Sequence, residues 1–310
     1  MLQIFQKTLL KPIKFSGIGL HSGNISNVRL VPTSENHGIK FKRTDLKTDN
    51  IIEANYKNVC SANLCTTVSN KNGVKVSTIE HLFAALYFTG VNNLLVEIDS
   101  EEIPILDGSA IKFFEIIQNA GTQSLTAKNK YLQVKNKIEI KDKHKSISLE
   151  PNDDGMIVDF NLVYKNKLIG NQRNSLNINK DDLTDIINAR TFCLHEDIEM
   201  IKKSGLAKGG SLQNAIVVKD NEILNHEGLR SKKEFVNHKI LDLVGDFLLS
   251  GYQILGKIVC DQGGHSLTNT FLRDVFDNPV NISNLEVIEL EKPKNKEYKI
   301  TSPLRVAASA

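Results

Sequence analysis

Hydrophobic positions recur along the chain at the spacings of short strands and amphipathic helices. In the first 125 residues, two helical patterns, each ending at a glycine, interrupt the alternation that is typical of strands. The elements expected there are strands at 28–31, 38–41 and 93–98 and helices at 78–88 and 109–119. Those expected in the remainder are strands at 131–140, 146–150, 156–164, 215–219 and 254–259 and helices at 182–189, 232–250 and after Gly264. Both halves contain strands plus two main helices, which predicts an α+β fold of two similar domains.

The polar segment 121–130 separates the two patterns and has no periodicity, so we expect a linker there. A chain of 310 residues is also longer than one hydrophobic core usually serves. We therefore place an N-terminal α+β domain at 1–125 and a C-terminal α+β domain at 126–302, and expect the tail after Pro303 to be loose. The glycine-rich segment 16–23 lacks the ending of a phosphate-binding loop and is expected to form a hairpin.

Composition is that of an ordinary globular protein, with 40% hydrophobic and 24% charged residues. The net charge of +3 suits an anionic small molecule but is too weak to indicate a nucleic-acid partner. The four cysteines form no C-x-x-C pair, so free thiols are expected. There is neither a signal-peptide pattern nor an apolar run of membrane-spanning length, so we expect a cytoplasmic protein without stable membrane insertion.

His238 and Asp242 lie four residues apart in the predicted helix 232–250, in which Ser231 and Glu234 have the spacing of a capping box. At 3.6 residues per turn, His238, Asp242 and Asp246 fall on one stripe, closely flanked by apolar residues. An imidazole and a carboxylate one turn apart can share a divalent ion, and zinc accepts both. The alternative is an ordinary ion pair on a solvent-exposed face.

Glu80 and His81 begin the predicted helix 78–88. Ser77 and Glu80 also have capping-box spacing, so Glu80 could be only a helix cap. Catalytic zinc usually has three protein ligands, and His81 could complete the set with His238 and Asp242. Glu80 would then be placed to accept a proton from water.

His265 follows two glycines that let the backbone approach a ligand, and it could serve as a general acid. The alternative is a plain strand-to-helix turn with an exposed histidine. Lysines crowd one region of the sequence, either as protection of an edge strand or as a rim that attracts a phosphate-bearing substrate. These are Lys128, Lys130, Lys135, Lys137, Lys141, Lys143 and Lys145.

Taken together, the ordered short motifs resemble the UDP-3-O-acyl-N-acetylglucosamine deacetylase family of lipid A biosynthesis (LpxC). The resemblance extends from about residue 16 to about residue 275. The runs that carry it are Ser16-Gly17-Ile18-Gly19-Leu20-His21-Ser22-Gly23, Thr78-Ile79-Glu80-His81-Leu82, Ile103-Pro104-Ile105-Leu106-Asp107-Gly108-Ser109-Ala110, Ala189-Arg190-Thr191-Phe192, Gly209-Gly210-Ser211, Leu224-Asn225, Gly228-Leu229-Arg230, His238-Lys239-Ile240-Leu241-Asp242 and Gly264-His265.

The resemblance implies two similar domains whose helices are sandwiched between their sheets. It implies zinc as the cofactor, held by His81, His238 and Asp242. The implied catalytic residues are Glu80 as general base, His265 as general acid or cationic stabiliser oriented by Asp246, and Thr191 with Lys239 for the developing oxyanion. An insert near 192–217 would form a passage for the substrate acyl chain. Its implied lining is Leu20, Phe192, Ile198, Ala207, Ser211 and Val217.

The sequence thus predicts a zinc-dependent deacetylase that acts as a monomer on UDP-3-O-acyl-N-acetylglucosamine and binds no nucleic acid. Two alternatives are a zinc amidase or peptidase with another substrate, disfavoured by the lack of H-E-x-x-H, and a metal-free module that binds sugar nucleotides or RNA. Two departures from the family pattern are Gln262-Gly263 where Lys-Ser is frequent and Asn92 where Asp is frequent. The first puts the detailed nucleotide contacts in doubt; neither affects the proposed metal ligands.

Overall fold

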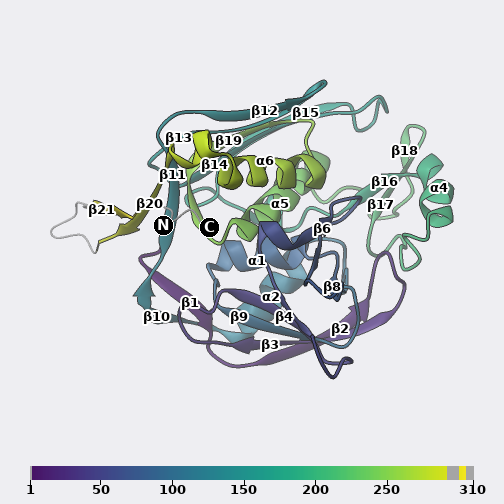
Figure 1. Ribbon diagram of the computed structural model, residues 1–310. Helices are drawn as coiled ribbons and strands as arrows, with labels where there is room; N and C mark the ends of the chain where they lie inside the picture. Colours follow the sequence, from purple (N-terminus) through teal and green to yellow (C-terminus); the bar gives the residue numbers. More distant parts are fainter. Residues whose placement is uncertain (1, 292–299, 305–310) are drawn as a thin grey trace.

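The computed structural model describes residues 2–291 and the backbone of 300–304. Its architecture is two β-sheets with the main helices between them, which confirms the predicted α+β sandwich (Figure 1). The four central helices are α1 (Glu80–Thr89), α2 (Ile111–Ala120), α5 (Glu234–Phe247) and α6 (His265–Asp277). Two come from each half of the chain, as the periodicity predicted.

One outer layer is a five-stranded sheet from the first half of the chain, in the order β2-β3-β9-β4-β5. Strands β2 and β3 form the hairpin predicted around residues 16–23, and β4 runs parallel to β9. The strand bounds are β2 Ile13–Ile18, β3 Ile25–Pro32, β9 Leu94–Ile98, β4 Ile39–Arg43 and β5 Ile51–Glu53.

The other outer layer is an eight-stranded sheet centred on the long strand β19 (Gln253–Asp261). One end of β19 pairs parallel with β11, and the rest pairs with β13 and β14. The other strands are β11 Lys130–Val134, β12 Ile138–Asp142, β13 Lys145–Pro151, β14 Met156–Val163, β15 Asn171–Asn177, β20 Leu285–Leu290 and β21 Ile300–Leu304. Strand β12, which contains Lys141 of the lysine cluster, is an edge strand. For that lysine the structure agrees with the explanation that lysine protects an edge strand.

Smaller elements surround this sandwich. Strands β16 (Phe192–Leu194), β17 (Ile216–Lys219) and β18 (Glu222–Ile223) form a small sheet that, with helix α4 (Ile198–Lys203), projects from one side (Figure 1). The remaining elements are β1 Phe5–Leu9, β6 Val59–Ser61, β7 Thr67–Ser69, β8 Lys75–Val76, β10 Thr122–Lys128, α3 Thr184–Ile187, α7 Pro279–Ile282 and the short 3-10 turns Tyr56–Asn58, His195–Asp197 and Leu248–Ser250.

Several predicted boundaries are wrong. The segment 121–130, predicted to be a linker, contains strand β10, which pairs antiparallel with β1. Because most residues of β10 are exposed, its sequence does not show the alternation of hydrophobic and polar residues that marks a half-buried strand. The strand predicted at 131–140 is two strands, because the backbone of Lys135 and Asn136 turns aside to bond with Asn284. The helix predicted at 182–189 is the single turn α3. Of the tail after Pro303, residues 305–310 lie outside the described residues.

The helices α1 and α5 pack unusually closely at Gly245. A Cβ atom built there would lie 2.1 Å from the Glu80 carbonyl oxygen and 3.1 Å from the backbone nitrogen of Ala84. The apolar faces of both helices belong to one continuous core that extends to both main sheets. This close approach places the start of α1, with Glu80 and His81, against the middle of α5.

Replacing Gly245 with Ala should therefore lower the free energy of unfolding by about 1–3 kcal/mol, because the backbone of α1 must move to admit the methyl group. Denaturant unfolding followed by circular dichroism measures this change. Gly264→Ala is the matched control, since a Cβ there meets nothing within 4 Å and its backbone is extended. Equal stability of Gly245→Ala and wild type would contradict the packing argument.

Candidate metal centre and active site

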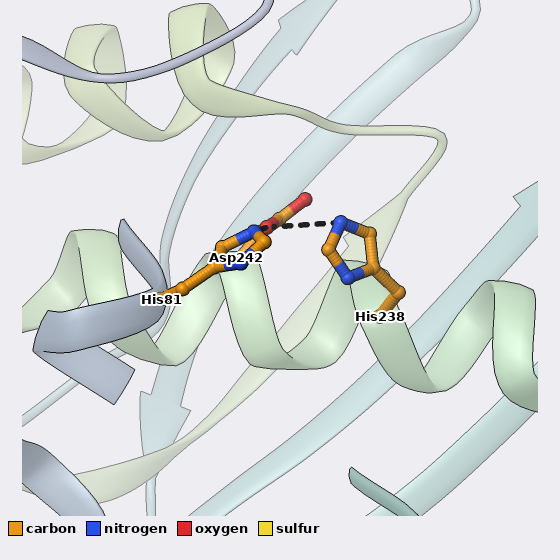
Figure 2. A group of neighbouring side chains, drawn as sticks. All are labelled: His81, His238 and Asp242. Atoms are coloured by element: carbon orange, nitrogen blue, oxygen red, sulfur yellow. Dashed lines mark ion pairs between the residues drawn. The ribbon is translucent and has the colours of Figure 1, made fainter. Parts of the chain in front are cut away.

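His81, His238 and Asp242 meet in the interior between α1 and α5. One possible ligand atom from each residue lies within 4.8 Å of the others, and all three side chains are buried. Nε2 of His238 lies 3.3 Å, and Nε2 of His81 3.5 Å, from Oδ1 of Asp242. Figure 2 shows the two histidine rings reaching the same carboxylate from different helices. The alternative of an ion pair on an exposed face is therefore wrong.

The donor set fits a divalent metal such as zinc. Oδ1 of Asp242 is buried and has no hydrogen-bond partner among the described residues, although two imidazoles flank it. Burial lowers the pKa of His238 to about 3, so its imidazole is neutral at physiological pH. Nδ1 of His238 lies 3.3 Å from the carbonyl oxygen of Ala189. Because a carbonyl oxygen can only accept a hydrogen bond, Nδ1 carries the proton of the neutral ring, and the lone pair on Nε2 faces Asp242. Neutral imidazoles and a carboxylate are ligands that zinc accepts.

Glu80 lies beside this set but does not cap its helix. Its Oε2 accepts a hydrogen bond from the backbone N–H of Thr66 at 3.1 Å, while Ser77 bonds to the carbonyl of Glu101. The helix-cap alternative for Glu80 is thus wrong. Burial raises the pKa of Glu80 above its usual value, despite the opposing influence of His265. Oε1 lies 3.9 Å from Nε2 of His265.

The backbone turn before α1 is strained at Thr78, whose φ of +55° is rare for a β-branched residue. The buried carboxylate of Glu102 holds this turn by accepting hydrogen bonds from the Thr78 hydroxyl and from the backbone N–H groups of His21 and Ser22. The hairpin 16–23 and the start of α1 are therefore fixed to each other. Strain of this kind persists only where surrounding contacts enforce it.

His265 begins α6, and its side chain is only 9% exposed, so the alternative of an exposed histidine in a plain turn is wrong. Its Nδ1 donates to Oδ2 of Asp246 at 2.7 Å, and its Nε2 is 3.9 Å from Oδ2 of Asp242. Burial disfavours the charged imidazole, but the carboxylates of Asp246 and Glu80 outweigh it and raise the pKa of His265 to about 10. These two carboxylates favour the protonated form of His265.

Lys239 contacts the cluster from within α5, and Thr191 lies in the segment that follows Ala189. Nζ of Lys239 donates to Oδ2 of Asp242 at 2.8 Å and lies 5.7 Å from the ring centroid of Phe192. Thr191 follows the segment whose Ala189 carbonyl faces His238, and its backbone bonds to Gly108 and Ile216.

A buried ion pair fixes this segment, and the sequence reasoning missed it. The guanidinium of Arg190 donates to Glu234 at 2.8 Å, and both side chains are at most 1% exposed. Glu234 also accepts from the backbone of Arg230, so the capping box predicted for Ser231 and Glu234 is wrong. Removing one partner of such a pair leaves an uncompensated buried charge, so each depends on the other.

Two cavities open beside the cluster. A cavity of about 730 Å³ is lined by Lys239 and His265 together with polar residues that include Lys141, Lys145 and Gln262. A second cavity of about 340 Å³ is mainly apolar and is lined by Thr191. All six residues predicted for the acyl passage also line it: Leu20, Phe192, Ile198, Ala207, Ser211 and Val217. Leu64 borders both cavities.

Sequence reasoning also missed Thr66, which contacts Glu80 and Asp246 from the loop between β6 and β7. No motif or periodicity marked it, because its role depends on contacts made far away in the chain. All four cysteines are free, and none of the helices in the described ranges is long and apolar enough to cross a membrane.

The sequence is similar to those of known proteins over most of its length. A family model described as LpxC, UDP-3-O-acyl N-acetylglycosamine deacetylase, matches residues 6–277. Proteins named UDP-3-O-acyl-N-acetylglucosamine deacetylase are similar throughout. The one from Geotalea uraniireducens is 42% identical over 94% of this chain and 94% of its own length. Those from Pseudoalteromonas translucida and Pasteurella multocida are each 40% identical, over 88% and 89% of this chain and 91% of their own lengths. The chain therefore belongs to the LpxC family of UDP-3-O-acyl N-acetylglycosamine deacetylases.

Proposed function

We propose that this protein is a zinc-dependent enzyme of lipid A biosynthesis that hydrolyses the acetamide of UDP-3-O-acyl-N-acetylglucosamine and releases acetate. Membership of the family supports the substrate, since the relatives carry that name. The observation that carries the proposal is the buried group of His81, His238 and Asp242 with Glu80 and His265 beside it. We assign zinc to the first three residues. When bound there, zinc supplies a Lewis acid that makes water more acidic and polarises the amide carbonyl.

Glu80 acts as the general base. The N–H of Thr66 holds one carboxylate oxygen, so the other oxygen can accept a proton from the attacking water. The water oxygen bonds to the amide carbon, and negative charge develops on the carbonyl oxygen. We assign stabilisation of this charge to the ammonium of Lys239, which contacts the ligand Asp242, and to the hydroxyl of Thr191, a lining residue of the apolar cavity.

His265 acts as the general acid. The carbon–nitrogen bond breaks as Nε2 gives its proton to the leaving amine, so acetate and a free amino sugar result. Asp246 holds Nδ1 of His265 at 2.7 Å and keeps the ring oriented and charged. Base and acid are thus separate groups with their reacting atoms 3.9 Å apart before substrate enters.

The two cavities suit the two ends of this substrate. We assign the acyl chain to the apolar cavity lined by Leu20, Phe192, Ile198, Ala207, Ser211 and Val217. The sugar nucleotide is assigned to the larger cavity, where Lys141 and Lys145 offer positive charge to the phosphates. Gln262 lines the same cavity and donates to the carbonyl of His144 at 3.4 Å.

We retain the proposed domains 1–125 and 126–302, with the insert near 192–217. The five-stranded and eight-stranded sheets, which are drawn from opposite sides of this boundary, support the division. Strand β10 crosses it while pairing with β1. We also propose that the protein is a monomer that acts in the cytoplasm.

Replacing a ligand should remove metal and activity together. In His238→Ala, zinc content measured by elemental analysis should fall well below one ion per chain, with a parallel loss of acetate release. His37→Ala is the matched control. His37 lines a third cavity with Asn92 and Asn93, and none of the three proposed ligands lines that cavity, so zinc should stay bound. Full zinc occupancy in His238→Ala would show that the ligand assignment is wrong.

Glu80→Gln should separate catalysis from structure. Glutamine keeps an oxygen for the Thr66 N–H but cannot serve as a base, so kcat should fall by roughly 10²–10⁴-fold while zinc content and melting temperature stay near wild type. Glu115→Gln, on the exposed side of α2, is the control for the same chemical change. An active but less stable Glu80→Gln enzyme would argue for a structural role instead.

The pH dependence of kcat tests the pairing of His265 with Asp246. Activity should be bell-shaped, and the alkaline limb should report loss of the proton from His265, whose pKa is raised to about 10. In Asp246→Asn, the imidazolium loses its anionic partner, its pKa falls, and the alkaline limb should move to lower pH. An unchanged limb in this variant would contradict the pairing.

A further inference from the structure

Thr66 makes two contacts that join the proposed base to the proposed acid. It lies in the loop between β6 and β7, distant in sequence from both α5 and α6, and is only 2% exposed. Its backbone N–H donates to Oε2 of Glu80 at 3.1 Å. Its hydroxyl donates to Oδ1 of Asp246 at 2.6 Å and lies 3.2 Å from Nδ1 of His265.

The hydrogen bond from the Thr66 hydroxyl restricts rotation of the Asp246 carboxylate. One oxygen of Asp246 accepts from Thr66 and the other accepts from His265, so each oxygen has a separate partner. A carboxylate held at one oxygen only could rotate and carry the His265 ring with it. Hydrogen bonds to a charged acceptor are stronger than those between neutral groups, so this contact is able to restrict that rotation.

The backbone contact acts on the other reacting group. Because Oε2 of Glu80 is bonded to Thr66, Oε1 is the oxygen that faces Nε2 of His265 at 3.9 Å. One residue therefore contacts two of the three carboxylates that lie near His265, those of Glu80 and Asp246. Thr66 is not among the residues that line the two cavities, although its neighbour Leu64 borders both.

We propose that Thr66 is a positioning residue that sets the placement of the general acid relative to the general base. Its hydroxyl acts through Asp246 on His265, and its backbone N–H acts directly on Glu80. This inference rests on the function proposed above. It differs from a purely structural role because it predicts a loss of turnover without a loss of substrate affinity.

The test compares Thr66→Val with Thr66→Ser in the zinc-loaded enzyme. Valine has the shape of threonine and keeps the backbone N–H but has no hydroxyl, whereas serine keeps the hydroxyl. Thr66→Val should lower kcat by about 10- to 100-fold with little change in KM, zinc content or melting temperature, and Thr66→Ser should restore most of kcat. Thr67→Val is the matched control, because the Thr67 hydroxyl lies 3.8 Å from Cys65 Sγ and is not part of the cluster; it should leave kcat unchanged.

A double variant tests the route of the effect. If the hydroxyl acts through Asp246, Thr66→Val combined with Asp246→Asn should lose no more activity than Asp246→Asn alone. Thr66→Ala takes the place of Thr66→Val, with the same expectation, if the valine enzyme does not fold.

Wild-type kcat in Thr66→Val, equal impairment by valine and serine, or additive losses in the double variant would overturn the inference. The proposed function fails separately, if the wild-type protein releases no acetate from the acylated sugar nucleotide. In that case crystal structures of the variants decide: a rotated Asp246 or His265 in Thr66→Val but not in Thr66→Ser supports positioning, and unmoved side chains in both refute it.

Discussion

The close packing of α1 against α5 at Gly245 is the constraint on which the candidate site depends. The absence of a side chain there lets the Glu80 carbonyl lie against α5, and Glu80 and His81 are the first two residues of α1. A side chain of ordinary size would separate the two helices and remove His81 from His238 and Asp242. The candidate metal centre is thus a product of helix packing in a close-packed core, where small changes in volume have large effects.

Several ionisable side chains share this interior, and each has a defined partner. Lys239 pairs with Asp242, His265 with Asp246, and Arg190 with Glu234. Burial of a charged group is costly unless the group is paired or bound to metal. Oδ1 of Asp242 is buried and has no hydrogen bond among the described residues, which supports a metal ion at this position. The same burial lowers the pKa of His238 and raises the pKa of Glu80, which suits the proposed roles of a neutral metal ligand and a general base.

The sequence predicted the central helices and the grouping of His238 with Asp242, because helical spacing fixes which residues share a face. It could not decide between a cap and a base for Glu80, because capping-box spacing is satisfied by either; the contact with Thr66, a tertiary one, decides against the cap. Thr66 itself and the pairing of β10 with β1 were not predictable, since neither leaves a periodic pattern. The acyl passage and the catalytic roles remain proposals, drawn first from the family resemblance and then supported by the cavities and contacts around the cluster.

The central claim is that one zinc ion is held between the two helices by His81, His238 and Asp242. The most direct test is a crystal structure of the zinc-loaded protein with diffraction data collected on both sides of the zinc absorption edge. We expect one strong anomalous peak within bonding distance of all three side chains, with Glu80 and His265 beside it but neither of them bonded to it. A peak at the cysteines or elsewhere, or none at this group in protein that hydrolyses the substrate, would contradict the account.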